Sequence, residues 1–135
     1  MDARAVDRAV IEQFRAGGEI QGMHRDRLVL LTTTGARTGK PRTTPMMFHR
    51  DDGRVLVIAS NQGAPRHPNW YFNLLATPRV IVELADQTYE ADAVPLGGKE
   101  RESMWSVITG LYPFFIEHEA TAGRKIPVVA LNRVD

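Results

Sequence analysis

The feature that most restricts the fold is a series of short β-branched and apolar runs separated by brief turns. Each run has strand length, and Gly, Pro or Asp residues interrupt the chain between runs. The six expected strands are 28–34, 42–50, 54–60, 79–84, 87–94 and 125–133. Asp51-Asp52-Gly53 and Ala85-Asp86 are expected to close two hairpins. Short antiparallel connections argue against a Rossmann domain and favour an α+β fold, a small barrel or roll.

Helical periodicity is confined to four segments between and around these strands. The expected helices are 2–16, 68–76, 98–109 and 113–120. A chain of 135 residues without internal repeats or a linker is typical of one domain. We therefore expect a single domain over residues 1–135, in which residues 1–24 form a helical extension.

The residue inventory excludes several kinds of chemistry. Cysteine is absent, which excludes disulfides, a thiolate nucleophile and cysteine-ligated zinc. The four His lack the spacing of metal ligands, so no metal site is expected, and no Gly-x-Ser-x-Gly elbow occurs. No apolar run approaches the roughly 18–20 residues of a membrane span. We therefore expect a cytoplasmic protein in which a bound cofactor carries any redox chemistry.

The formal net charge of +1 conceals two oppositely charged halves. Residues 25–79 contain nine Lys and Arg against three Asp, whereas residues 80–120 contain eight acids against two basic residues. The basic half indicates an anionic partner. Nucleic acid is the less favoured candidate, because no recognition helix or aromatic RNP-like strand accompanies the cations.

The densest polar feature is the segment 32–44, which holds six Thr, three cations and no acid. Its two Gly expose backbone N–H groups, and the Arg fork suits phosphate or carboxylate. The segment is not a P-loop, because Pro41 follows Lys40 where Ser or Thr would be required. Spacing alone leaves two alternatives open, an anion site and a solvated hairpin.

Three successive aromatic residues, Trp70, Tyr71 and Phe72, mark the expected helix 68–76. Successive side chains point about 100° apart on a helix, so the three cannot all face one core. At least one is expected to reach a ligand, a partner or a second subunit. In the alternative interpretation, Trp70 anchors the core and Asn69 caps the helix.

Two sequence blocks together resemble the deazaflavin-dependent nitroreductase family. The first is 30–42 followed by Pro45, and the second is 63–65 with 67–74 and Thr77-Pro78. The likeness runs from about Asp26 to the C-terminus and includes 125–129. It implies a split β-barrel with flanking helices, a source in actinobacteria, and binding of coenzyme F-420, a 5-deazaflavin with a phosphodiester and oligoglutamate tail.

The resemblance also implies which residues bind the cofactor. Those along the tail are Ala36, Arg37, Thr38 and Arg42, and Lys40 is added on its charge. Those beneath the deazaflavin ring are Thr43, Thr44, Pro45, Met46 and Met47, and those along its other edge are Ile58, Ala59, Ser60 and Asn61. Those at the cofactor-facing start of the helix are Asn69, Trp70 and Asn73.

The implied reaction is hydride transfer from the reduced deazaflavin to a quinone, an activated alkene or a nitro-aromatic acceptor. The implied acceptor pocket consists of Tyr112, Ser60, Phe115 and His118. Phe115 and His118 stand where the family's nitroreductases carry Tyr, and Asn61 stands where Lys is common. These departures from the family pattern leave the identity of the acceptor undetermined.

Two other functional classes stay open beside this reductase. One is a non-catalytic module that binds the cofactor or a lipid, and the other is an FMN-binding split-barrel protein. The expected partner is a small-molecule acceptor. The chain is expected to act as a monomer or homodimer, without stable membrane insertion but with peripheral contact at the inner membrane face as an option.

Overall fold

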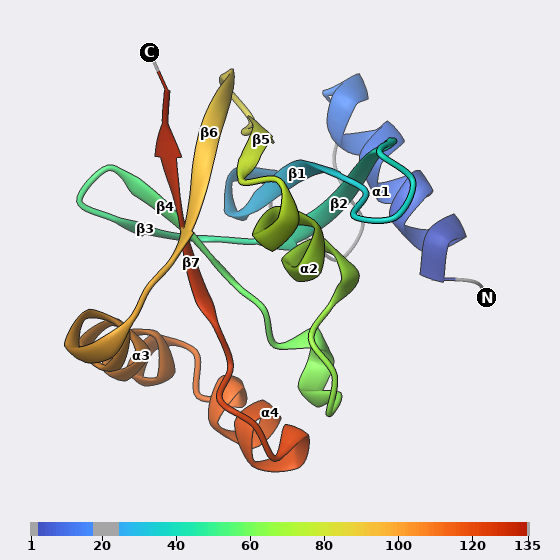
Figure 1. The fold of residues 1–135 in the computed structure, drawn as a ribbon. Coiled ribbons are helices and arrows are strands. Elements are labelled where there is room, and N and C mark those ends of the chain that lie inside the picture. The colour runs from blue at the N-terminus through green and yellow to red at the C-terminus, as the bar shows by residue number, and fades with distance from the viewer. Residues whose placement is uncertain (1–2, 18–24, 135) are drawn as a thin grey trace.

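The computed structural model describes residues 3–17 and 25–134, which form one curled sheet with helices around it (Figure 1). The helical elements are α1 (Ala3–Ala16), η1 (Arg25–Arg27), η2 (Asn61–Gly63), α2 (Asn69–Ala76), α3 (Gly98–Leu111) and α4 (Phe114–Ala122). The strands are β1 (Leu28–Thr34), β2 (Pro41–Met47), β3 (His49–Asp51), β4 (Arg54–Ile58), β5 (Arg79–Glu83), β6 (Thr88–Pro95) and β7 (Val128–Arg133). The expected α+β class with an antiparallel barrel is confirmed.

The strand order explains how the sheet curls. Its seven strands run β2-β1-β5-β6-β7-β4-β3, with every neighbouring pair antiparallel. The two edge strands, β2 and β3, are consecutive in the chain and are separated only by Phe48. The sheet must therefore bend until its two edges meet at Phe48. This geometry closes the barrel on one side and leaves it open along the remainder of β2.

The expected single strand 42–50 is in fact two strands with different partners. β2 pairs with β1, where Met47 lies opposite Leu28, and β3 pairs with β4, where His49 lies opposite Leu56. Between them Phe48 is buried in the barrel core with 8% exposure. This change of partner raises the strand count from the six expected to seven.

The expected hairpin turn between β3 and β4 is confirmed. Asp51 pairs with Arg54, so Asp52 and Gly53 are the two loop residues. Both have positive φ angles, 51° and 81°. Two successive positive φ angles are the signature of the type I′ turn, whose twist matches the strands that it joins. The second expected hairpin is also present, as β5 paired with β6.

Alternate residues of the central strands face two separate hydrophobic clusters, as the pleat requires. In β4, Val55 and Val57 belong to the barrel core, whereas Leu56 and Ile58 pack in a second cluster with Trp105 and Ile108 of α3. A third cluster joins α1 to β1. Because β1 and β4 are covered on both faces, neither strand has an exposed residue.

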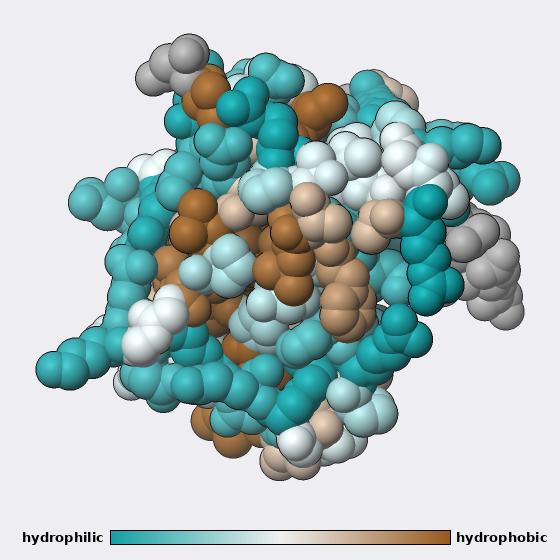
Figure 2. All heavy atoms as spheres, in the orientation of Figure 1, coloured by the Kyte–Doolittle hydropathy of each residue, from teal (hydrophilic) through white to brown (hydrophobic). Residues whose placement is uncertain are grey.

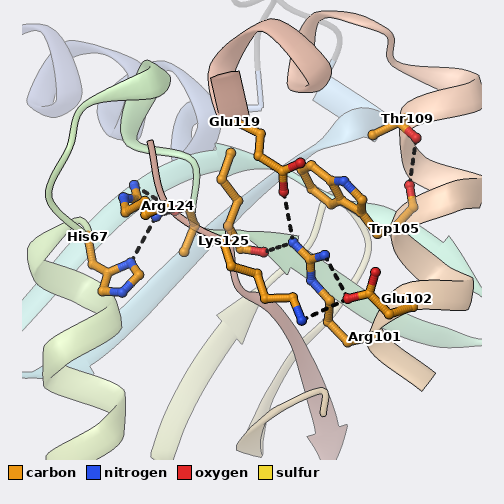
Figure 3. A network of polar contacts seen from close by, with 10 residues as sticks. His67, Arg101, Glu102, Trp105, Thr109, Glu119, Arg124 and Lys125 are labelled. Atoms are coloured by element: carbon orange, nitrogen blue, oxygen red, sulfur yellow. Dashed lines mark hydrogen bonds and ion pairs between the residues drawn. The ribbon is translucent and has the colours of Figure 1, made fainter. Parts of the chain in front are cut away.

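The position of α3 and α4 is fixed by the buried side chain of Arg101, which is 4% exposed (Figure 3). Its guanidinium group donates hydrogen bonds to Glu119 of α4 and to the carbonyl oxygen of Ile126, just before β7. It also lies 4.5 Å from the ring centroid of Trp105. One side chain thereby ties both helices to the sheet. In the part of the chain that the structure describes, no helix is long and apolar enough to cross a membrane.

Candidate functional site

The candidate site follows the opening of the barrel between β2 and β4. Continuing the β3–β4 register from the pair His49–Leu56 places Met47 opposite Ile58 and Pro45 opposite Ser60. β2 and β4 are not hydrogen-bonded neighbours there: the partner of β2 is β1, and the partner of this part of β4 is β7. The two predicted borders of the deazaflavin ring, 43–47 and 58–61, therefore lie on the two sides of one opening.

One end of the opening carries the polar loop 35–40. The loop is tight: the N–H of Gly35 donates to the Lys40 carbonyl and the N–H of Gly39 donates to the Gly35 carbonyl, both at 2.8 Å. A Cβ atom on Gly35 would lie only 2.6 Å from Thr38 Oγ1. The exposed cations Arg37, Lys40 and Arg42 surround this loop, and none forms an ion pair with a described residue.

Asn73 of α2 holds this loop in place from beneath. Its side chain is 9% exposed, and its Oδ1 accepts a hydrogen bond of 2.9 Å from the N–H of Ala36. Its Nδ2 donates to Thr33 Oγ1 at 3.1 Å. Asn73 thus connects α2, β1 and the loop. The geometry makes it a positioning residue for the cationic loop.

The three successive aromatic residues of α2 have different environments. Trp70 is 8% exposed and belongs to the barrel core, Tyr71 is half-buried, and Phe72 is 37% exposed beneath the guanidinium of Arg66. Trp70 therefore fits the core-anchor interpretation. The helix was expected to begin at Pro68, or to be capped by Asn69. In the structure Pro68 occupies the cap position, and Asn69, which is exposed, is the first helical residue.

The other end of the opening is apolar. Met47 and Ile58, from its two sides, belong to the same cluster as Tyr112 and Phe115 from the α3–α4 corner. The Tyr112 hydroxyl lies 3.5 Å from His49 Nδ1. A pocket of about 390 Å³ opens beside it and is lined also by Phe48 and Leu111 and by three charged residues, Asp26, Arg27 and Arg50. Figure 2 shows apolar side chains gathered near the middle of the face seen in Figure 1, with hydrophilic residues around them.

The remaining predicted site residues are mostly buried. Phe115 is 3% exposed and packs against Trp105, so it contributes to the cluster rather than to an open surface. Ala59 is fully buried in the barrel core, and Ser60 beside it is 8% exposed. His118 is half-buried, its ring faces Phe114 and Phe115, and its Nδ1 has no hydrogen-bond partner among the described residues.

The segment 59–67 is held by Arg124, which sequence reasoning missed. Its guanidinium donates to the carbonyl oxygens of Ala59, Ser60, Ala64 and Arg66 at 3.1–3.4 Å. It also lies 2.9 Å from His67 Nδ1 (Figure 3). Burial lowers the pKa of Arg124. Burial and then the charge of Arg124 lower the pKa of His67.

The lowered pKa of His67 predicts a loss of stability in acid. The native state resists protonation because Nδ1 faces Arg124, whereas the unfolded chain binds a proton near pH 6.5. The stabilisation is therefore complete above about pH 6.5 and is lost as the pH falls through the lower, folded pKa. Thermal melts between pH 7.5 and 5 should show a smaller decrease in Tm for His67→Gln than for the unaltered protein. Equal decreases in Tm for the two proteins would contradict the lowered pKa of His67 as the cause of the acid sensitivity.

The two ends of the opening are separated by the length of a strand. Met47 is five residue steps along β2 from Arg42, a span of about 17 Å at the rise of an antiparallel strand. Unpaired cations at one end and apolar and aromatic side chains at the other fit an extended ligand with an anionic tail and a flat ring. Among the described residues, no cluster of acids and His could hold a metal ion.

Comparisons with known proteins identify relatives along nearly the whole chain. The sequence profile of the F420H(2)-dependent quinone reductase family matches residues 4–133. An F420H(2)-dependent quinone reductase of Mycobacterium tuberculosis is 34% identical over 108 residues, which cover 78% of this chain and 72% of that protein.

Two solved structures have the same fold at similar identity. An F420-H2 dependent reductase, FDR-A, is 38% identical with a TM-score of 0.71, and the match covers 82% of this chain and 100% of that one. A structure described as a domain-swapped dimer is 37% identical with a TM-score of 0.74, and the match covers 93% of this chain and 96% of that one. From the family match over residues 4–133 and the agreement in fold, this chain belongs to the F420H(2)-dependent quinone reductase family.

Proposed function

We propose that this protein binds reduced coenzyme F-420 along the opening between β2 and β4 and reduces a quinone at the Tyr112 corner. As a member of its family, the protein is an F420H(2)-dependent reductase. The observation that carries the proposed binding mode is the opening itself, with unpaired cations at one end and an apolar, aromatic corner at the other. When bound, the reduced deazaflavin supplies the hydride.

The cationic end suits the phosphodiester and carboxylates of the cofactor tail. Arg37, Lys40 and Arg42 are exposed around a loop that hydrogen bonds already hold in one conformation. A preformed site loses little conformational freedom when an anion binds. Arg42 is the second residue of β2, the strand that borders the opening, so a tail bound there would direct the ring along β2.

The side chains of β2 that follow Arg42 divide between two faces. Thr44 and Met46 share a face with Arg42, because side chains alternate along a strand. Thr43, on the other face, is engaged by the hydroxyl of Thr32 at 2.8 Å. Across the opening, the peptide groups of Ser60 and Asn61 border the proposed ring position. In this arrangement the chain places the ring and excludes water.

A quinone fits the acceptor corner better than a nitro-aromatic compound. Met47, Leu111 and Tyr112 offer apolar and aromatic surface. The Tyr112 hydroxyl can donate to a carbonyl oxygen beside the pocket, which Arg27 and Arg50 also line. Phe115 has no hydroxyl and is buried against Trp105. The M. tuberculosis relative is named a quinone reductase, which agrees with a quinone as the acceptor.

The proposal is tested by following oxidation of the reduced cofactor with three acceptors: menadione, an activated enone and a nitro-aromatic compound. We expect menadione to be reduced with the highest kcat/KM. Faster reduction of the nitro compound or the enone would overturn the choice of acceptor. Fluorescence titrations with coenzyme F-420 and FMN test the cofactor: a tight FMN complex without deazaflavin binding would contradict the proposal, as would binding without turnover of any acceptor.

Replacing Tyr112 by Phe should slow the reduction of menadione. The change removes one hydroxyl donor and keeps the ring that packs against Phe115. The loss of one hydrogen bond to the acceptor is expected to lower kcat about fivefold to tenfold. The Kd for coenzyme F-420 should stay unchanged, and Tyr89→Phe, on distant β6, is the matched control. An unchanged kcat for Tyr112→Phe would remove this hydroxyl from the mechanism.

We also propose that the protein functions as a homodimer. Support comes from the relative that is described as a domain-swapped dimer and that matches 93% of this chain. Light scattering coupled to size-exclusion chromatography should give about twice the monomer mass of 15.1 kDa. A monomer mass at all protein concentrations would contradict this proposal.

Peripheral membrane contact is a further proposal for the same acceptor corner. Leu111, Phe114 and Ile116 are 58%, 42% and 56% exposed there. These side chains would let the corner approach a bilayer that holds a lipid-soluble quinone. Co-sedimentation with vesicles should fall when Leu111 and Phe114 are both replaced by Ser. Equal sedimentation of the two proteins, or none of the unaltered one, would contradict the contact.

A further inference from the structure

We propose that Arg124 positions the deazaflavin ring by holding segment 59–67, one border of the opening, through its main-chain carbonyl groups. This inference rests on the binding mode proposed above. Arg124 follows Gly123, whose left-handed backbone ends α4, and its side chain reaches under the segment (Figure 3). It touches neither the tail loop nor the Tyr112 hydroxyl in any recorded contact. Its proposed role is therefore positioning rather than catalysis.

The contacts of Arg124 use the planar fork of a guanidinium. Donors on all three nitrogens reach four carbonyl oxygens, those of residues 59, 60, 64 and 66, and Nη1 also reaches His67 Nδ1. A Lys ammonium has three donors on a single nitrogen and cannot span this set. In the part of the chain that the structure describes, Arg124 forms no ion pair with a carboxylate.

The lack of a carboxylate partner separates Arg124 from Arg101, the other arginine at this end of the molecule. Arg101 engages Glu102, Glu119 and the ring of Trp105, and so locks helices together (Figure 3). Arg124 instead donates hydrogen bonds to the main-chain carbonyl groups of a single segment. A partly buried cation that bonds only carbonyl oxygens and one imidazole is costly to keep, and its lowered pKa reflects that cost.

The segment that Arg124 holds contains a strained turn. Asn61 and Gln62 have φ angles of 50° and 54°, values that residues other than Gly rarely adopt. At Gly63, with φ of 83°, an added Cβ would lie 3.3 Å from His118 Cα of α4. Such a turn persists where its surroundings fix it. Here α4 packs against one part of the turn, and Arg124 bonds the residues on both sides of it.

This fixed turn determines where Ser60 and Asn61 present their peptide groups to the opening. Ser60 accepts from Arg124 through its carbonyl, and Asn61 Nδ2 donates to the carbonyl of Arg66, which Arg124 also holds. Loss of Arg124 would release all four carbonyl groups that it bonds on the two sides of the turn. The ring border would then lose its fixed position, while the loop 35–40, held by Asn73, would stay in place.

The test uses two ligands that separate the ring from the tail: coenzyme F-420 and the tail-less 5-deazariboflavin. Arg124→Gln is expected to weaken binding of both ligands by about tenfold, because the released ring border must be ordered each time a ligand binds. Arg42→Ala should weaken binding of coenzyme F-420 alone. Arg66→Gln is the matched control, because it removes a positive charge from segment 59–67 itself. The Arg66 side chain contacts the Phe72 ring and forms no hydrogen bond with the described residues. The variant should bind both ligands as the unaltered protein does.

Turnover gives a second readout, because misplacing the ring lowers kcat even when cofactor saturates the enzyme. We expect Arg124→Gln to lower kcat with menadione at saturating reduced cofactor, and circular dichroism at the assay temperature to show folded protein. If Arg124→Gln does not fold, Arg124→Lys, which keeps the charge and loses the fork, should show the same pattern. A folded Gln or Lys variant with unaltered affinities and kcat would overturn the inference and leave the proposed function intact. Failure of the unaltered protein to bind either ligand would overturn the proposed function instead.

Discussion

Replacing Arg42 by Ala is expected to weaken binding of coenzyme F-420 by roughly 10-fold to 100-fold. A hydrogen bond between charged groups contributes about 1.5–3 kcal/mol, and each 1.4 kcal/mol is a factor of ten in Kd. Arg42 is exposed, and its side chain forms no hydrogen bond or ion pair within residues 3–17 and 25–134, so the substitution breaks no such contact there. The loss should therefore appear in binding and leave the thermal stability nearly unchanged.

Two further variants identify the source of the Arg42 effect. Arg42→Lys keeps the charge and loses the bidentate fork, so its Kd should lie between those of the unaltered protein and Arg42→Ala. Arg54→Gln removes a charge from an ion pair with Asp51 at the β3–β4 hairpin and should bind the cofactor normally. Raising the salt concentration should reduce the differences in Kd among these proteins, because salt screens exposed charges. Equal affinity for Arg42→Ala and the unaltered protein would show that the loop is a solvated hairpin.

Local chemistry in the sequence was sufficient to predict most of the secondary structure. Asp52-Gly53 can adopt two successive positive φ angles, and this ability fixed the β3–β4 hairpin. The division of 42–50 into β2 and β3 has no such signal, because both halves have strand composition. What separates them is the partner on each side, β1 or β4, which depends on how the whole sheet curls. Burial of Phe48 at the change of partner is a tertiary effect.

The site shows the same division between local and long-range information. The cationic loop could be predicted because its Thr, Gly and Arg residues are contiguous. Arg124 could not, because its contacts lie 57 to 65 residues away and its neighbours form no motif. The resemblance placed Asn73 at the cofactor, but could not reveal that both polar atoms of its side chain bond within the protein. Such assignments depend on which element the fold brings alongside.

Replacing Asn73 by Ala is expected to lower the free energy of unfolding by about 2–4 kcal/mol. The change deletes two hydrogen bonds and leaves the buried Thr33 hydroxyl and the N–H of Ala36 without these partners. Each buried group left unsatisfied costs about 1–3 kcal/mol. Urea unfolding monitored by circular dichroism should measure the loss. Asn69→Ala, at an exposed position in the same helix, is the matched control and should lose less than about 0.5 kcal/mol.

Asn73→Ala also tests whether Asn73 acts by holding the loop 35–40 or by contacting the cofactor. If Asn73 acts by holding Ala36, its loss frees the loop 35–40, and the cations must be ordered again each time the tail binds. Binding of coenzyme F-420 should weaken about tenfold, whereas the tail-less deazariboflavin should bind as before. Thr33→Val, which keeps the bond from Asn73 to Ala36, should lose stability and retain affinity. If Asn73→Ala weakened binding of both ligands equally, Asn73 would contact the ring, and its role as a support for the loop would be wrong.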